Sequence, residues 1–176
     1  IKKLNDIEIF RVYENAIKYL EKPTVKAQAE EQIIIIRSEW ARRSEIAMKF
    51  PHKKALRPEK GLLSLMGYNV GNMGAPEKSR QYIIDEVMTQ QLPFIGGGAY
   101  MQEWGEPNSK KRYNKLLRTI IGFLDKNRNF RGMEKAVIEW NDDTPKLLVQ
   151  LTHIRGDFDQ ENKFIIKNFD IDNKIT

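Results

Sequence analysis

The chain of 176 residues contains no cysteine and only two histidines, His52 and His153. The absence of cysteine excludes disulfide bonds, thiolate metal sites and a cysteine nucleophile, and it favours a reducing, cytoplasmic location. Two isolated histidines give no pattern of metal ligands, so we expect neither a metal nor another cofactor. Long apolar runs are also absent. The longest candidate, four isoleucines at 33–36, is far shorter than the ~20 residues that span a bilayer, so we expect no membrane partner.

Recognisable catalytic motifs are missing too. The sequence has no strand–Gly-x-Ser-x-Gly–helix element, and its glycine-rich stretches match neither a phosphate-binding Walker loop nor a dinucleotide fingerprint. Two carboxylate pairs, Asp85/Glu86 and Asp142/Asp143, are adjacent in sequence and therefore diverge by about 100° on a helix. We assign no catalytic residue, although a catalytic triad assembled across the fold stays open.

The net charge of +6 is unevenly distributed. Residues 37–60 carry a charge of +5 and residues 109–132 carry +7, while no other part of the chain has a positive excess. Such blocks suit a polyanionic partner, nucleic acid first. A solvated, lysine-rich surface accounts for the charge equally well.

Apolar residues recur at helical spacing along most of the chain. The pattern predicts helices over residues 4–21, 24–50, 61–68, 76–88, 109–127 and 133–140, and a further one from Thr144 to about residue 154. Thr24, Asn108 and Thr144 are the expected helix caps. The isoleucines at 33–36 could instead form a buried strand, because β-branched residues are less favourable in helices.

The sequence therefore predicts an all-α fold, a compact multi-helix domain over residues 1–155. Residues 156–176 would form a C-terminal tail, either irregular or a short pair of β-strands. We expect a flexible break at residues 93–98. We place Trp40 and Leu117 in the core, because each lies on an apolar stripe.

The helix predicted over residues 109–127 has two distinct faces. One is apolar and contains Tyr113, Leu116, Leu117, Ile120, Ile121 and Leu124. The opposite, basic face is expected to hold Lys111, Arg112, Lys115, Arg118 and Lys126. Together with the segment before residue 60, it gives the candidate nucleic-acid-binding residues: Arg42, Arg43, Lys53, Lys54, Arg57, Lys111, Arg112, Lys115, Arg118 and Lys126.

Four sequence runs between residues 57 and 145 carry a resemblance: LLSLMGYNVGNMG, R-x-x-I-I at residues 80–84, YMQEWGEPNSKKR and AVIEW. They resemble an uncharacterised bacterial helical domain associated with restriction and phage-defence genes. The resemblance implies a modular accessory domain and supplies no catalytic residue. Residues 61–88 also look like the helix–loop–helix motif of SAP/HeH-type DNA-binding domains, although two ordinary core helices would give the same pattern.

The leading hypothesis is a nucleic-acid-binding accessory module of a bacterial defence or restriction system, with DNA favoured over RNA. Phosphate contacts would supply affinity without reading sequence. The alternative is a non-catalytic protein-interaction subunit, in which Phe94, Tyr100, Trp104 and Trp140 anchor a partner.

Overall fold

The computed structural model describes residues 1–49 and 59–154, which form seven α-helices and no strand. The helices are α1 (Asp6–Tyr19), α2 (Lys26–Lys49), α3 (Leu62–Leu65), α4 (Glu77–Thr89), α5 (Gly98–Trp104), α6 (Lys110–Asn127) and α7 (Glu134–Ile154). The predicted all-α fold class is confirmed. The predicted tail, residues 156–176, lies outside the described residues.

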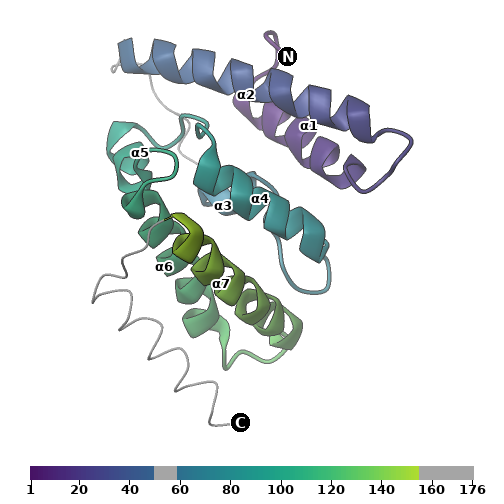
Figure 1. Ribbon diagram of the computed structural model, residues 1–176, viewed down its shortest axis with the longest axis vertical. Helices are drawn as coiled ribbons and strands as arrows, with labels where there is room; N and C mark the ends of the chain where they lie inside the picture. Colours follow the sequence, from purple (N-terminus) through teal and green to yellow (C-terminus); the bar gives the residue numbers. More distant parts are fainter. Residues whose placement is uncertain (50–58, 155–176) are drawn as a thin grey trace.

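The helices are arranged in three tiers (Figure 1). α1 and α2 form an antiparallel pair at one end, α3 and α4 lie in the middle, and α6 pairs with α7 at the other end. The short helix α5 packs against α6, and α4 contacts α1, α6 and α7. One continuous cluster of buried apolar side chains includes members of all of these helices, so a shared core holds the tiers together.

The α1–α2 pair is fixed by a cap at one end and by aromatic packing along its length. The Asn5 side chain accepts the backbone N–H of Glu8, and the Glu8 carboxylate accepts the N–H of Asn5, which completes a capping box. The ring of Trp40 lies 5.4 Å from that of Phe10 and 4.9 Å from that of Tyr13, measured between centroids. The predicted core position of Trp40 is confirmed.

The four isoleucines at 33–36 lie on a helix and not on a strand. Ile33 and Ile36 are buried, whereas Ile34 and Ile35 are exposed. A three-residue spacing brings the first and the last to the same helix face, while a strand would have buried alternate residues. The helix begins at Lys26, so Thr24 lies in the preceding turn and the predicted cap is one residue too early.

Two further predicted helix boundaries are wrong. Ser109, not Asn108, caps α6, because its hydroxyl accepts the N–H of Arg112, while the Asn108 N–H bonds the carbonyl of Met88. Residue 144 does not start a new helix, since α7 continues through it. The Thr144 hydroxyl donates to the Trp140 carbonyl 2.8 Å away and is therefore engaged inside the helix.

The expected break at residues 93–98 is followed by an unexpected helix. α5 begins at Gly98, directly after Gly96 and Gly97, both of which have positive φ angles. A Cβ at residue 96 would lie 2.9 Å from the Tyr100 ring, so glycine is also required there sterically. The glycine-rich sequence hid α5, because those residues suggest a loop even where the next turn is helical.

A buried carboxylate connects the α3–α4 segment to α7. Asp143 is fully buried and accepts hydrogen bonds from Tyr68 Oη at 2.8 Å, Arg80 Nε at 2.8 Å and the Gln81 amide at 2.6 Å. Its sequence neighbour Asp142 is exposed. The two carboxylates therefore point in different directions, as their adjacency predicts, and Asp143 has a structural role with its charge balanced by Arg80.

Candidate nucleic-acid interface

The orientation of α6 is set by its apolar stripe. Its predicted members Tyr113, Leu116, Leu117, Ile120 and Leu124 are buried, and Ile121 is half-buried. The opposite face consequently turns outward, and Lys111, Arg118 and Lys126 on it are exposed. The core position predicted for Leu117 is confirmed.

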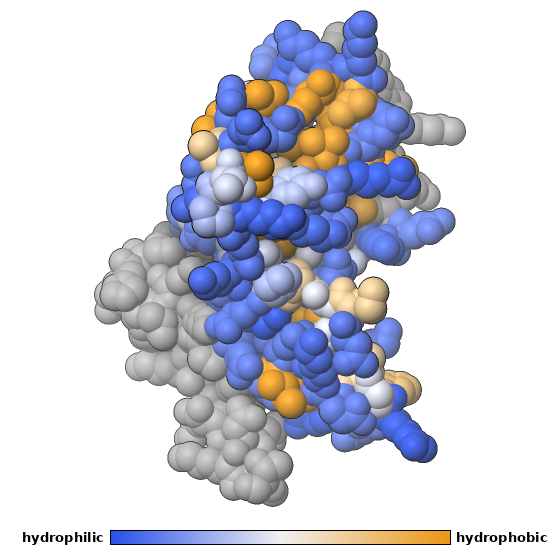
Figure 2. All heavy atoms as spheres, turned by 90° about the vertical axis from the view of Figure 1, so that its right-hand side faces the viewer, coloured by the Kyte–Doolittle hydropathy of each residue, from blue (hydrophilic) through white to orange (hydrophobic). Residues whose placement is uncertain are grey.

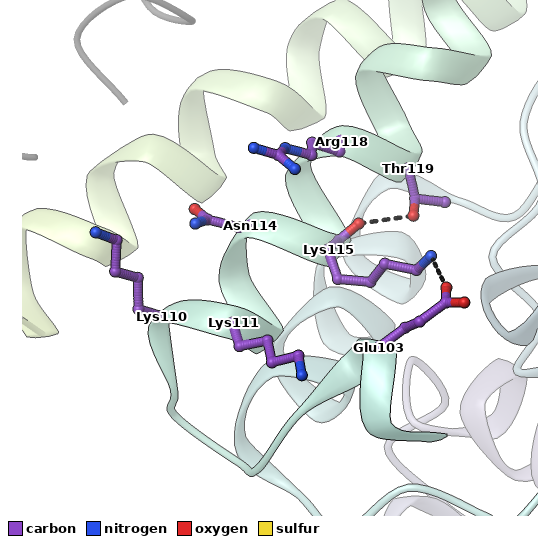
Figure 3. A pocket seen from close by; sticks show the side chains of 7 residues that line it. All are labelled: Glu103, Lys110, Lys111, Asn114, Lys115, Arg118 and Thr119. Atoms are coloured by element: carbon purple, nitrogen blue, oxygen red, sulfur yellow. Dashed lines mark hydrogen bonds and ion pairs between the residues drawn. The ribbon is translucent and has the colours of Figure 1, made fainter. Parts of the chain in front are cut away.

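A broad surface depression of about 850 Å³ lies along the first half of α6 (Figure 3). We call it the α6 groove. The described residues that line it are Glu103, Lys110, Lys111, Asn114, Lys115, Arg118 and Thr119. Four of these side chains are cationic and one is a carboxylate, so the groove has a clear positive excess.

The cationic side chains leave α6 in two directions. Lys110, Asn114 and Arg118 extend to one side, whereas Lys111 and Lys115 extend to the side of α5 (Figure 3). This division follows from helix geometry, because residues separated by four positions are neighbours on a helix surface. Both rows border the same depression. An extended anion lying in the groove could therefore be contacted from both sides.

Glu103 is the acidic member of the groove and comes from α5. Its carboxylate accepts a hydrogen bond from Lys115 Nζ at 2.5 Å, and this bond and the lysine charge lower the pKa of Glu103. Lys115 Nζ also lies 6.0 Å from the centroid of the buried Trp104 ring, within cation–π range. The carboxylate occupies a position on Lys115 for which an incoming anion would compete.

Arg112 is not part of the basic face, and its predicted position there is wrong. It precedes Leu116 by four residues, so it lies on the buried side of α6 and is only 1% exposed. Its guanidinium donates to the carbonyls of Val87 at 2.6 Å, Gly105 at 2.6 Å and Trp104 at 3.1 Å. A group held in this way cannot reach a phosphate.

The environment of Arg112 explains why an arginine is buried there. Its carbonyl partners belong to the C-terminal ends of α4 and α5, which have no further helical N–H groups to bond. Burial lowers the pKa of Arg112 to about 10, which still leaves the group charged at neutral pH. The cation therefore binds two helix ends whose dipoles favour positive charge.

The two described candidates of the first basic block, Arg42 and Arg43, do not join the α6 groove. Arg42 donates to the Glu39 carboxylate at 2.6 Å, and Arg43 bonds both Glu39 at 2.7 Å and Asp6 at 2.6 Å. They lie on α2, at the opposite end of the molecule from α6 (Figure 1). The other candidates of this block, Lys53, Lys54 and Arg57, lie outside the described residues.

The aromatic anchors expected for a protein partner are mostly internal. Trp104 and Trp140 are buried in the core, so their prediction as exposed anchors is wrong. Tyr100 is half-buried, and its hydroxyl accepts the backbone N–H of Leu62 at 3.2 Å. Phe94 is also half-buried. None of these four side chains is fully available to a partner.

Sequence reasoning missed four residues of the α6 groove: Glu103, Lys110, Asn114 and Thr119. Lys110 and Asn114 could have been found, because they precede Arg118 by eight and four residues and share its row on the helix. Glu103 could not have been found in this way. It precedes Lys115 by twelve residues and lies on a different helix, and only the packing of α5 against α6 brings the two together.

Other kinds of site find no support in the part of the chain that the structure describes. Residues 1–49 and 59–154 contain no cluster of acidic residues and histidines able to hold a metal ion. None of the described helices combines the length and apolar character that a bilayer crossing needs. Comparisons with family models, with curated proteins and with solved structures found no match.

Proposed function

We propose that this protein is a nucleic-acid-binding module and that the α6 groove contacts the phosphates of its partner. One observation carries the proposal: four cationic side chains from a single helix border one depression, and only one carboxylate lines it among the described residues. Such an excess attracts polyanions, and each neutralised phosphate releases condensed counterions.

The phosphate chemistry is common to DNA and RNA, so the proposal covers both. Lysine and arginine contacts with phosphates determine affinity and position but read no base sequence. The Thr119 hydroxyl in the groove donates to the Lys115 backbone carbonyl at 2.7 Å, and the described residues contain no metal cluster, which favours binding over catalysis. Its role as an accessory module in a restriction or phage-defence system rests on the sequence resemblance alone and stays a prediction.

The test is a charge reversal inside the groove, Lys115→Glu combined with Arg118→Glu. We expect the affinity for nucleic acid to fall at least about tenfold near 0.1 M salt, whatever the sequence, because two attractive contacts become repulsive. The measurement is an electrophoretic shift or fluorescence polarisation series at two salt concentrations. Circular dichroism should show the wild-type helix content.

The matched control is Lys2→Glu combined with Lys3→Glu. These exposed lysines precede α1, far from α6, and their reversal changes the net charge by the same amount (Figure 1). The control should retain most of the affinity. Equal losses in both variants would mean that only net charge matters, and a wild type that binds no nucleic acid at low salt would refute the proposal.

A protein-interaction subunit is the second candidate, on different grounds from those that the sequence suggested. The outer face of α2 exposes Ile34 to 59% and Ile35 to 45%. Apolar side chains gather at the height of α1 and α2 on the face shown in Figure 2. Protein interaction becomes the preferred function if the protein is not retained on DNA, RNA or heparin at low salt.

A further inference from the structure

A glycine lies in the middle of the outer face of α6, where the fold does not require one. Gly122 follows Arg118 by four residues and precedes Lys126 by four, so it is the neighbour of both on the helix surface. It is exposed, and no atom would lie within 4 Å of a Cβ added there. Its φ angle is not among the positive ones. Neither packing nor backbone conformation explains the glycine.

Glycine in a helix interior is less favourable than alanine, because it loses more backbone freedom on folding. At residue 122 its one structural effect is to leave the helix backbone uncovered between two cationic side chains. A ligand that lies against α6 can therefore approach the backbone closely at this point. Gly122 also links the α6 groove to Lys126, so one basic surface extends from Lys111 to Lys126. At 1.5 Å per residue this surface is about 22 Å long.

An exposed aromatic side chain follows the basic helix in the chain. Directly after α6, the connection to α7 presents Phe130, which is 63% exposed and lies between the exposed Arg128 and Arg131. The backbone around this ring is held by two hydrogen bonds, from Phe130 N–H to the Asn127 carbonyl at 3.0 Å and from Met133 N–H to the Phe130 carbonyl at 3.1 Å. The ring is thus presented on an ordered turn.

An aromatic ring at the end of a basic track suits one class of nucleic acid. Single strands offer unstacked bases that stack on exposed aromatic side chains, while cationic side chains follow the backbone. A duplex keeps its bases stacked on one another and would leave the ring without a partner. The single carboxylate on this face of α6, Asp125, is paired with Arg128 at 3.3 Å, which reduces its repulsion of phosphates.

We infer that α6 and the turn after it bind single-stranded nucleic acid, whose backbone passes over Gly122 and one of whose bases stacks on Phe130. The inference rests on the proposed function and specifies its ligand. Lys111, Lys115, Arg118 and Lys126 contact successive phosphates along the helix. Phe130 contributes a contact that does not depend on charge and therefore persists at higher salt.

The first test substitutes Phe130→Ala and measures fluorescence polarisation with a labelled single strand of about 12 nucleotides and with a hairpin duplex. The wild type should bind the single strand more tightly. The substitution should weaken single-strand binding by about 5- to 100-fold and leave duplex binding nearly unchanged, as expected for the loss of one stacked base. The control is Ile138→Ala, which removes a similarly exposed apolar side chain from α7 and should have no effect.

The second test is Gly122→Ala, for which the inference predicts opposite changes in stability and binding. The melting temperature should rise by about 2–4 °C, because alanine favours the helix, whereas single-strand affinity should fall. Gly98→Ala places a methyl group at another open helical glycine and should not alter the affinity.

The outcomes separate this inference from the proposed function. Duplex binding as tight as single-strand binding, or unchanged affinity in Phe130→Ala or Gly122→Ala, would overturn the inference but leave the α6 groove as a phosphate-binding site. Binding of neither oligonucleotide by the wild type would overturn both.

Discussion

The two basic segments of this protein differ in what their charges do. In the described part of the first segment, Arg37, Arg42, Arg43 and Lys49 on α2 are all paired with carboxylates of the same chain. In the second, the outer face of α6 turns four cationic side chains toward a groove lined by a single described carboxylate. The cationic side chains of α2 therefore neutralise carboxylates of the protein itself, whereas those of α6 create a positively charged surface.

The difference comes from the surroundings of each helix. α2 packs between neighbours that present acidic groups, since Asp6 is the first residue of α1 and Glu86 belongs to α4. Arg37 and Arg43 reach these groups across helix interfaces, whereas Arg42 pairs with Glu39 of α2 itself. In the α6 groove the described carboxylate is Glu103 of α5, which bonds Lys115. A block of positive charge in a sequence thus indicates a binding surface only where the cationic side chains outnumber the carboxylates packed against them.

Removal of Arg37 should produce the largest effect. Arg37 donates to both oxygens of Glu86, whose side chain is almost completely buried. In Arg37→Met this carboxylate stays buried without its partner, so the free energy of unfolding should fall by about 3 kcal/mol, the low end for buried pairs, because Arg37 itself is partly exposed. Denaturant melts measure the change, and nucleic-acid affinity should stay the same when the protein is folded.

Glu86→Gln in the Arg37→Met background is the control for this prediction. It removes the buried negative charge and should restore part of the lost stability. Equal stability of the single and the double variant would show that the charge of Glu86 is not the cause.

The second largest effect is expected in the salt dependence of nucleic-acid binding. Substitutions in the two basic segments should change it differently. Removing two phosphate contacts with Lys115→Glu and Arg118→Glu should make the slope of log K against log salt shallower by about 1.4–1.8, at 0.7–0.9 per phosphate. Arg42→Gln alters an arginine that is already paired with Glu39 and should leave the slope unchanged. A shallower slope for Arg42→Gln would place the first basic segment in the interface after all.

Acid should affect the α2 pairs specifically. Hydrogen bonds from Arg42 and Arg43 lower the pKa of Glu39 from 4.5 to about 2. Because the carboxyl is ionised more readily in the folded state, its contribution to stability is complete above pH 4.5 and is lost as the pH falls toward 2. Thermal melts over this range should show a smaller acid-induced loss for Glu39→Gln than for the wild type. Parallel curves would contradict the assignment.

The smallest expected effect comes from Glu103. Its ion pair with Lys115 is exposed, so Glu103→Gln should leave the melting temperature nearly unchanged. The affinity for nucleic acid should rise a few-fold, because Lys115 no longer has a carboxylate that competes with phosphate. Gln102→Glu tests the opposite change at the neighbouring exposed position of α5 and should not increase the affinity. Weaker binding by Glu103→Gln would show that Glu103 supports the groove.

The sequence by itself determined the all-α fold class, most of the helices, the inner face of α6 and the core positions of Trp40 and Leu117, but not α5 or the unbroken length of α7. These follow from the spacing of apolar residues, which is a local property. It also determined that Asp142 and Asp143 diverge, because adjacent residues on a helix point in different directions. The ends of the helices were predicted less accurately, because capping depends on individual side-chain contacts such as that of Ser109.

Only the tertiary structure decided which charged groups are buried and which pair across helices. Arg112 and Lys111 are adjacent, yet one bonds the carbonyl ends of α4 and α5 while the other faces the groove. Arg43 and Lys115 are both paired, with Asp6 and Glu103 respectively, across distances in sequence that no periodicity reveals. The physical reason is that a buried or paired charge depends on partners from other helices, and their positions are fixed only when the helices pack.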